Sequence, residues 1–274
     1  MGRWGKRLLG LHAWLVFAFL YLPIVVLVAF SFNASRLNVV WEGFTLQWYG
    51  EMVRDAAIVR AARNSLIVAT VSTIVSTLLG TLTAFALARH RFRWKRWLEG
   101  LLYIPIILPE IVMGISLLAF FALVGMRLSL TTMIIAHITF CAAFVSVVVR
   151  ARLHGLDRTL ERAAMDLGAN EWRTFWKVTF PLVSPGIIAG ALIAFTLSLD
   201  DVIISFFTAG PGSTTLPLYV LSMVRLGVNP KVNALSATML VVTFLLMTIA
   251  YLLPMGRRMR RAATGGQDQP GQII

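Results

Sequence analysis

Three carboxylates stand out because they lie inside or at the ends of strongly apolar stretches of the chain. They are Glu110, Asp200 and Asp201, three of only 12 acidic residues in a chain of 274. A charged side chain at the centre of a bilayer costs about 2.5–3.5 kcal/mol on insertion scales, so each of these acids needs a partner. No lysine or arginine lies in the same stretches. The simplest chemistry for these acids is reversible binding of a cation inside a membrane.

Each of these acids also has a structural alternative. A carboxylate can lie at the external interface, cap the end of a helix, or pair with an arginine of a partner subunit. Asp200 and Asp201 are adjacent, so on a helix their side chains point about 100° apart and cannot share one proton as a catalytic dyad does. His137 is the one histidine expected near such a pathway, and a packing role is the simpler expectation for it.

The motifs of hydrolytic and nucleotide-binding enzymes are absent from this sequence. It contains no His-Glu-x-x-His zinc motif, no Gly-x-Ser-x-Gly nucleophile elbow and no Walker A motif. We therefore expect a non-catalytic chain without a metal or cofactor of its own. If ATP drives its function, another polypeptide must hydrolyse the ATP.

A second group of candidates lies in a polar, basic segment, about residues 155–184, between two apolar stretches. From Glu161 it reads Glu-Arg-Ala-Ala-Met-Asp-Leu-Gly, and it continues to Val-Thr-Phe-Pro at 178–181. The pattern predicts a helix, a glycine turn, a second helix and a proline stop. Its aromatic residues form an apolar face that nothing in the loop covers, which is typical of a docking surface: Trp172, Phe175, Trp176 and Phe180.

This segment resembles the coupling loop of ABC-importer permeases, the membrane subunits of binding-protein-dependent transport systems. The family pattern is Glu-Ala-Ala, three residues, Gly, nine residues, an aliphatic residue, one residue and Leu-Pro. Six positions fall on that spacing: Ala163, Ala164, Gly168, Val178, Phe180 and Pro181. Arg162 occupies the family's Glu position, and Glu161 lies one residue earlier.

The likeness covers nearly the whole chain and is closest to the second permease subunit of spermidine/putrescine importers. The runs Leu199-Asp200-Asp201 and Gly227-Val228-Asn229-Pro230 look like that polyamine branch. The resemblance implies a type I importer fold and polyamine uptake by alternating access. Because they are carboxylates in apolar stretches, we expect Glu110, Asp200 and Asp201 to line the substrate pathway. The resemblance also implies that one set of residues couples the chain to an ATPase: Glu161, Arg162, Ala163, Ala164, Asp166, Gly168 and Pro181.

The same resemblance implies a set of partners. They are a second homologous permease subunit, two copies of a cytoplasmic ABC ATPase that bind ATP and Mg, and an extracytoplasmic polyamine-binding protein. Two other functions fit part of these observations. One is an ABC permease for another cationic or small polar solute. The other is an ion-coupled secondary transporter, in which the acids bind the coupling ion and no ATPase is needed.

The elements that must position these residues are apolar stretches long enough to cross a bilayer, which takes about 20 helical residues. With 58% hydrophobic residues and a mean hydropathy of +0.79, the composition predicts an all-α membrane protein. The third stretch contains Pro105 and Pro109 and should kink or break. We expect six transmembrane helices near these ranges: Leu8–Phe30, Ser65–Ala88, Leu98–Leu123, Ser129–Val149, Ile187–Phe207 and Ala234–Pro254.

The net charge of +13 reflects membrane topology rather than nucleic-acid binding. Most of the 25 lysines and arginines lie before the first stretch, after the second, after the fourth and after the sixth. The positive-inside rule then places both termini and the segment 155–184 in the cytoplasm. The resemblance implies that the membrane is a bacterial inner membrane. We expect one permease domain over residues 1–262 and a disordered cytoplasmic tail over residues 263–274.

Overall fold

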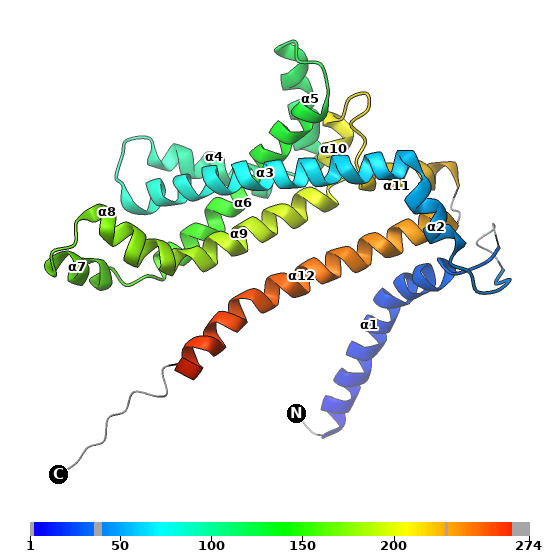
Figure 1. The fold of residues 1–274 in the computed structure, drawn as a ribbon, viewed down its shortest axis with the longest axis horizontal. Coiled ribbons are helices and arrows are strands. Elements are labelled where there is room, and N and C mark those ends of the chain that lie inside the picture. The colour runs from blue at the N-terminus through cyan, green and yellow to red at the C-terminus, as the bar shows by residue number, and fades with distance from the viewer. Residues whose placement is uncertain (1–2, 36–39, 228–229, 265–274) are drawn as a thin grey trace. The chain divides into compact units, whose positions relative to one another are not determined.

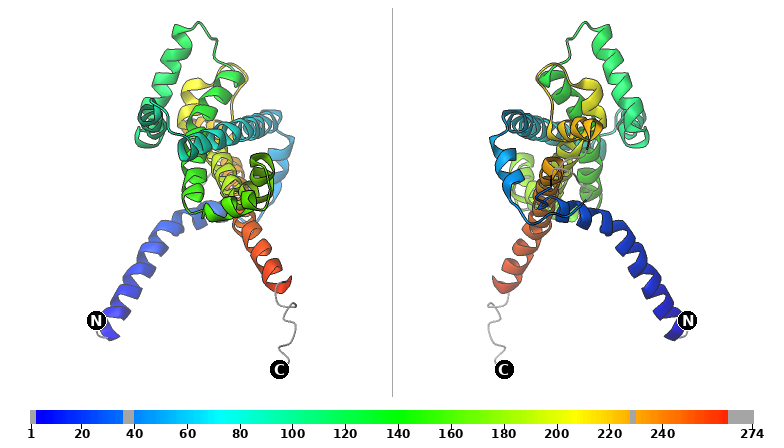
Figure 2. Two further views of the ribbon diagram at one scale, coloured as in Figure 1. Left: turned by 90° about the vertical axis from the view of Figure 1, so that its left-hand side faces the viewer. Right: turned by 90° about the vertical axis from the view of Figure 1, so that its right-hand side faces the viewer.

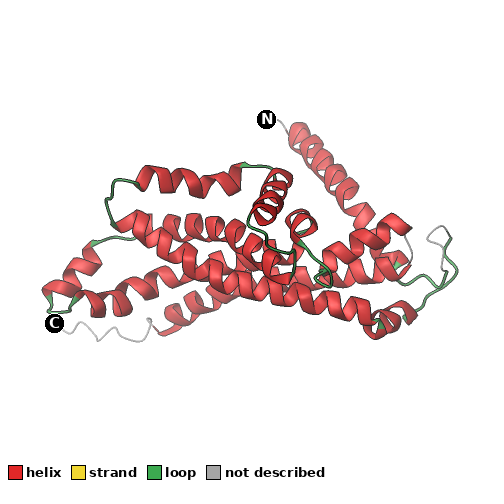
Figure 3. Cartoon of the chain, turned by 90° about the horizontal axis from the view of Figure 1, so that it is seen from above, coloured by secondary structure: helices red, strands yellow, loops and turns green. Residues whose placement is uncertain are grey.

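The computed structural model describes residues 3–35, 40–227 and 230–264, and the secondary structure of these residues is helical (Figure 1, Figure 3). The strand-like pairing found within them is one β-bridge, between Asn33 and Phe44. The contacts of the chain divide it into two compact units. The first contains Met1–Ala61 and Leu218–Phe244, and the second contains Ala62–Pro217 and Leu245–Ile274. All the candidate residues lie in the second unit.

The first unit is organised around the loop that follows α1 (Arg3–Phe30). The Trp48 indole, on α2 (Gln47–Arg54), donates a 2.7 Å hydrogen bond to the backbone carbonyl of Asn33. Asp55 pairs with Lys231, and this hydrogen bond holds the pKa of Asp55 below its usual range. The unit also takes in the start of α3 (Ala56–Arg89) and parts of α11 (Leu216–Leu226) and α12 (Pro230–Thr264).

The second unit contains the rest of α3 and the elements that position the candidate residues. Their bounds are α4 (Lys95–Ile107), α5 (Glu110–Leu123), α6 (Leu130–His154), α7 (Thr159–Asp166), α8 (Glu171–Thr174), the π-helix η1 (Phe175–Thr179), α9 (Phe180–Asp200) and α10 (Ile203–Thr208).

The core of the second unit lies where α6 packs against α9. Val145 of α6 and Ala194 of α9 are both fully buried. Glycines on two neighbouring helices allow the close approach: a Cβ atom at Gly80 of α3 would lie 2.7 Å from the Cβ of Val145, and one at Gly190 of α9 would lie 3.3 Å from its Cγ1. Small residues at helix contacts are the usual way in which membrane helices pack closely.

Within the described residues, four helices are long and apolar enough to cross a membrane: Arg7–Phe30, Ala56–Arg89, Leu130–His154 and Glu171–Asp200. The break that we predicted in the third apolar stretch is confirmed, because α4 and α5 are bent by 114° relative to each other (Figure 2). Leu108 at the break is extended, with φ −70° and ψ 142°. Proline disfavours a helical conformation at the residue before it, so Pro109 ends α4 at this point.

The predicted fifth stretch, Ile187–Phe207, is not one continuous helix. The helix ends at Asp200, and Asp201 is extended with φ −65° and ψ 130° before α10 begins at Ile203. The predicted sixth stretch falls in α12, whose described apolar part is Pro230–Leu245. Helix α12 runs to Thr264, and residues 265–274 of the predicted tail lie outside the described residues.

Candidate functional site

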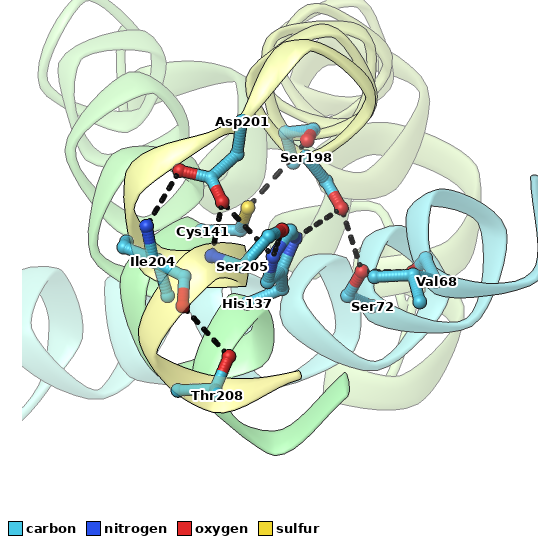
Figure 4. A network of polar contacts seen from close by, with 10 residues as sticks. Val68, Ser72, His137, Cys141, Ser198, Asp201, Ile204, Ser205 and Thr208 are labelled. Atoms are coloured by element: carbon cyan, nitrogen blue, oxygen red, sulfur yellow. Dashed lines mark hydrogen bonds and ion pairs between the residues drawn. The ribbon is translucent and has the colours of Figure 1, made fainter. Parts of the chain in front are cut away.

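The break between α9 and α10 is organised by the carboxylate of Asp201 (Figure 4). Its Oδ1 accepts a 3.2 Å hydrogen bond from the backbone N–H of Ile204, and its Oδ2 accepts one of 2.7 Å from the N–H of Ser205. These are first-turn donors of α10, which have no partner within that helix. Asp201 therefore has the geometry of a helix cap, which is one of the structural alternatives considered above.

His137 of α6 is the second organising residue of this break, and its side chain is 2% exposed. Its Nδ1 lies 2.7 Å from the hydroxyl of Ser198, and its Nε2 lies 3.0 Å from the hydroxyl of Ser205 and 3.3 Å from Oδ2 of Asp201. The Ser198 hydroxyl also lies 3.0 Å from that of Ser72 on α3. We call these five residues the His137 network, and Figure 4 shows them converging from α3, α6, α9 and α10.

Asp200 has a different environment from its neighbour. It is the last residue of α9 and is exposed, and no hydrogen bond or ion pair to another described residue satisfies its carboxylate. Glu110 is similar: it is exposed, begins α5 directly after Pro109, and is likewise unpaired within the described residues.

The two helix breaks belong to one packed region of the second unit. Helices α5 and α10 are in contact. A Cβ atom at Gly114, one turn beyond Glu110, would lie 2.6 Å from the ring of Phe207 on α10. Two interrupted helices therefore pack together, and each presents one exposed, unpaired carboxylate at its break. Discontinuous helices at membrane depth are typical of transporter binding sites.

The basic segment predicted at 155–184 folds as a helix, a glycine turn and a second helix. Gly168 follows α7 with φ +88°, a conformation that L side chains rarely adopt. Asn170 then caps α8 by accepting a 2.8 Å hydrogen bond from the N–H of Arg173. The predicted order of these elements and the position of the turn are confirmed.

The predicted proline stop is wrong. Pro181 lies in the first turn of α9, and the helical path is continuous from Glu171 to Asp200. The wide π-turn of η1 comes directly before it. Proline cannot donate a backbone hydrogen bond and clashes with the preceding turn of a regular helix, so the wider turn provides room for Pro181.

Glu161 is held inside the protein rather than presented on its surface. Both terminal guanidinium nitrogens of Arg89, the last residue of α3, donate to its carboxylate, and the hydroxyl of Thr179 donates a third bond of 2.6 Å. The hydrogen bonds from Arg89 hold the pKa of Glu161 below its usual range. Sequence reasoning did not find Arg89 or Thr179, because nothing in the local pattern links either residue to Glu161.

The other coupling candidates lie on the outside of the segment. Arg162, Ala163 and Asp166 are exposed, and Ala164 is half-buried. Leu167, beside the glycine turn, is 90% exposed. The predicted aromatic face is only partly uncovered: the ring of Phe175 packs on Phe85 of α3 with centroids 5.6 Å apart, whereas Trp172 and Trp176 remain exposed.

Comparison with known proteins agrees with this arrangement. Residues 76–260 match the family described as "Binding-protein-dependent transport system inner membrane component". The chain is 45% identical over 246 residues to the spermidine/putrescine transport system permease protein PotC of Escherichia coli K12, which covers 90% of this chain and 93% of the relative. It is 44% identical over 231 residues to the putrescine transport system permease protein PotI of the same organism, over 82% of each chain.

A solved structure supports the same fold. A chain of a bacterial ABC transporter involved in the import of the acidic polysaccharide alginate has a TM-score of 0.71 at 18% identity, over 93% of this chain and 96% of that chain. The helical fold, the family match over residues 76–260 and the identity to relatives over most of the chain lead to one assignment. This chain belongs to the family of inner membrane components of binding-protein-dependent transport systems.

Proposed function

We propose that this chain is a transmembrane permease subunit of an ATP-driven ABC importer that takes up polyamines, putrescine and spermidine. The observation that carries the proposal is its 45% identity, over 90% of its length, to a permease named for spermidine and putrescine. A relative named for putrescine supports the same substrate class. The chain is a non-catalytic subunit, and the partner ATPase binds ATP and Mg and hydrolyses the ATP.

The substrate pathway passes the two helix breaks, and its acidic residues are Glu110, Asp200 and Asp201. Polyamines carry protonated amines separated by flexible methylene chains, and such amines form their strongest hydrogen bonds with carboxylates. Asp200 and Glu110 are exposed and unpaired among the described residues, which suits direct contact with the substrate. Asp201 supports the same site from within the α9–α10 break.

The chain crosses the bacterial inner membrane six times as a single permease domain over residues 1–262, with both termini in the cytoplasm. The four long apolar helices, the bent α4–α5 pair and α12 supply the six spans. Segment 155–184 then lies on the cytoplasmic side between spans four and five, where arginine and lysine are enriched.

In this position the segment is the coupling loop, and its exposed side chains dock on the ATPase. Arg162, Ala163 and Asp166 supply polar and small contact surface, and the Gly168 turn presents it. Ala164 and Pro181 maintain the helices on either side, and Glu161 joins the loop to α3 through Arg89. The complete importer contains a second homologous permease subunit, two ATPase copies and an extracytoplasmic polyamine-binding protein.

The test is uptake of radiolabelled putrescine and spermidine by cells in which the gene is deleted and then restored. We expect uptake to be lost and regained, and the co-purified complex to show ATPase activity that the loaded binding protein stimulates. Unchanged uptake after deletion would overturn the polyamine assignment. Unchanged uptake with an ATPase still co-purifying would keep the permease assignment and change the solute.

Asp200→Asn tests the pathway within the same assay. A hydrogen bond to a charged group contributes about 1.5–3 kcal/mol, so we expect uptake efficiency to fall roughly tenfold or more. The matched control is Glu51→Gln, which changes an exposed acid on α2. Wild-type uptake by the Asp200→Asn variant would remove this residue from the pathway.

A further inference from the structure

Asp200 and Asp201 are adjacent in the sequence but differ in exposure and in hydrogen-bond partners. The Asp201 side chain is 5% exposed, and it is shared between two backbone N–H groups and the ring of His137. Asp200 is exposed and lacks a partner within the described chain. Helix α9 ends between them, so the two carboxylates point into different surroundings.

His137 is itself held in one orientation by three elements. Ser198 of α9 contacts Nδ1, while Ser205 of α10 and the Asp201 carboxylate both lie near Nε2. Ser72 extends the contact to α3 through Ser198. A ring fixed at both nitrogens is aimed at one oxygen of Asp201, which a histidine that only fills space would not require.

A buried carboxylate without a partner is strongly unfavourable, so it attracts whatever cation can reach it. In this break the reachable cation is the substrate, if the proposed function holds. The ring of His137 already lies against the Asp201 carboxylate, so Asp201 does not need to bind the substrate cation. The number of carboxylates offered to a passing polyamine therefore depends on a residue that need not contact the polyamine.

We propose that His137 is a specificity-positioning residue, which keeps Asp201 engaged so that Asp200 is the single carboxylate offered to substrate at the end of α9. The inference rests on the proposed function and deepens it. It predicts that the permease, and not only the binding protein, sets the preference between a diamine and a triamine. Loss of His137 leaves the Asp201 carboxylate with only its two backbone N–H donors and so makes it available to a cation, which favours the polyamine with one more charge.

The test is the ratio of spermidine to putrescine uptake by the complete importer in proteoliposomes, with each substrate supplied on the same saturating binding protein. We expect His137→Leu to lower uptake of both and to raise the ratio by about two- to fivefold, the range that corresponds to one partly exposed ion pair. His137→Gln, whose amide can still reach Asp201 and Ser205, should keep the ratio closer to that of the wild type than His137→Leu does.

The decisive variant is the double substitution His137→Leu with Asp201→Asn. It removes the carboxylate that the first substitution releases, so the ratio should return toward that of the wild type even if total uptake stays low. A purely structural role for His137 predicts no such return. An unchanged ratio in His137→Leu, or a changed ratio that Asp201→Asn does not correct, would overturn the proposal.

Failure of the proposed function is distinguished by a readout that needs no substrate. If the wild-type importer takes up neither putrescine nor spermidine, the polyamine assignment is rejected, and the proposed effect on selectivity is rejected with it. The pairing of His137 with Asp201 is then decided from melting temperatures of the detergent-solubilised complex. If the two residues are coupled, the melting temperature of the double variant should be no lower than that of the less stable single variant. A decrease equal to the sum of the two single decreases would reject the pairing.

Discussion

At the scale of single residues, the surroundings of each acid determine its role more than its place in a motif does. Asp201 and Glu161 are each satisfied by groups from other helices. Asp200, Glu110 and Asp166 are exposed. A carboxylate that is already bonded inside the protein contributes to the folded structure, and an exposed, unpaired one is available to a ligand or a partner.

Glu161 makes a testable contribution to stability that depends on pH. Its pKa is lowered in the folded state because Arg89 donates to the charged carboxylate. That contribution is fully present above the ordinary glutamate pKa, about 4.3, and is lost as the pH falls through the lower folded-state value. We expect Glu161→Gln to lower the melting temperature of the complex at pH 7.

The difference between Glu161→Gln and the wild type should then close as the pH is lowered from 7 to 3. The measurement is the melting temperature of the detergent-solubilised complex across that range. Glu171→Gln, an exposed acid at the start of α8, is the matched control and should show little difference at any pH. A difference for Glu161→Gln that stays constant down to pH 3 would show that its charge is not responsible.

At the scale of elements, the residues of the proposed substrate pathway and coupling segment lie where helices end or widen. Helix α4 ends before Pro109, α9 ends at Asp200, and the π-turn of η1 precedes Pro181. Each interruption presents side chains that a regular helix would direct elsewhere. The glycine turn between α7 and α8, where Gly168 has a positive φ, belongs to the same class and lies in the proposed coupling segment.

The backbone conformation of Gly168 predicts which substitutions the turn accepts. A Cβ atom there would meet nothing within 4 Å, so the cost of substitution comes from φ +88° alone. That cost is roughly 1–2 kcal/mol for most residues and smaller for asparagine, which adopts left-handed conformations more readily. We expect Gly168→Val to reduce uptake and binding-protein-stimulated ATPase activity, and Gly168→Asn to retain most of both.

The control for this prediction is the amount of assembled complex in the membrane, which both variants should preserve. Equal loss in the valine and asparagine variants would show that the side-chain surface at position 168, and not the turn, is what the ATPase requires. Full activity in both would remove the turn from coupling altogether.

At the scale of the whole molecule, apolar surface and charge distribution define a membrane protein that functions with partners. The segment Arg7–Phe30 is a continuous apolar helix long enough to cross a bilayer, as expected for a helix that lipid or another subunit surrounds. Only 12 acidic residues occur against 25 lysines and arginines, and these basic residues lie mainly in the segments proposed to face the cytoplasm.

The proposed six-span topology predicts opposite accessibility for two exposed positions. The native chain has one cysteine, Cys141, which is fully buried and gives a low labelling background. We expect Leu167→Cys to react with a membrane-impermeant maleimide only from the cytoplasmic side, and Arg127→Cys only from the external side. Labelling of both cysteines from the same side would show that the chain does not cross the membrane once between these two positions.

Several properties could be predicted from the sequence because they depend on local composition and spacing. The all-helical class follows from apolar stretches that must satisfy their own hydrogen bonds in lipid. The break before Glu110 follows from the steric effect of Pro109, and the turn at Gly168 follows from the conformational freedom of glycine. The coupling-like segment was recognisable because its spacing is contained within one short stretch of chain.

Other properties were decided only by the tertiary structure, because they join residues far apart in sequence. Arg89 meets Glu161 across 72 positions, and His137 meets Ser198 across 61. No local pattern distinguishes Asp200 from Asp201, yet packing gives one of them a histidine and two backbone donors and leaves the other exposed. The sequence determined where the charges are, and only the packing of the helices determined which of them are already satisfied.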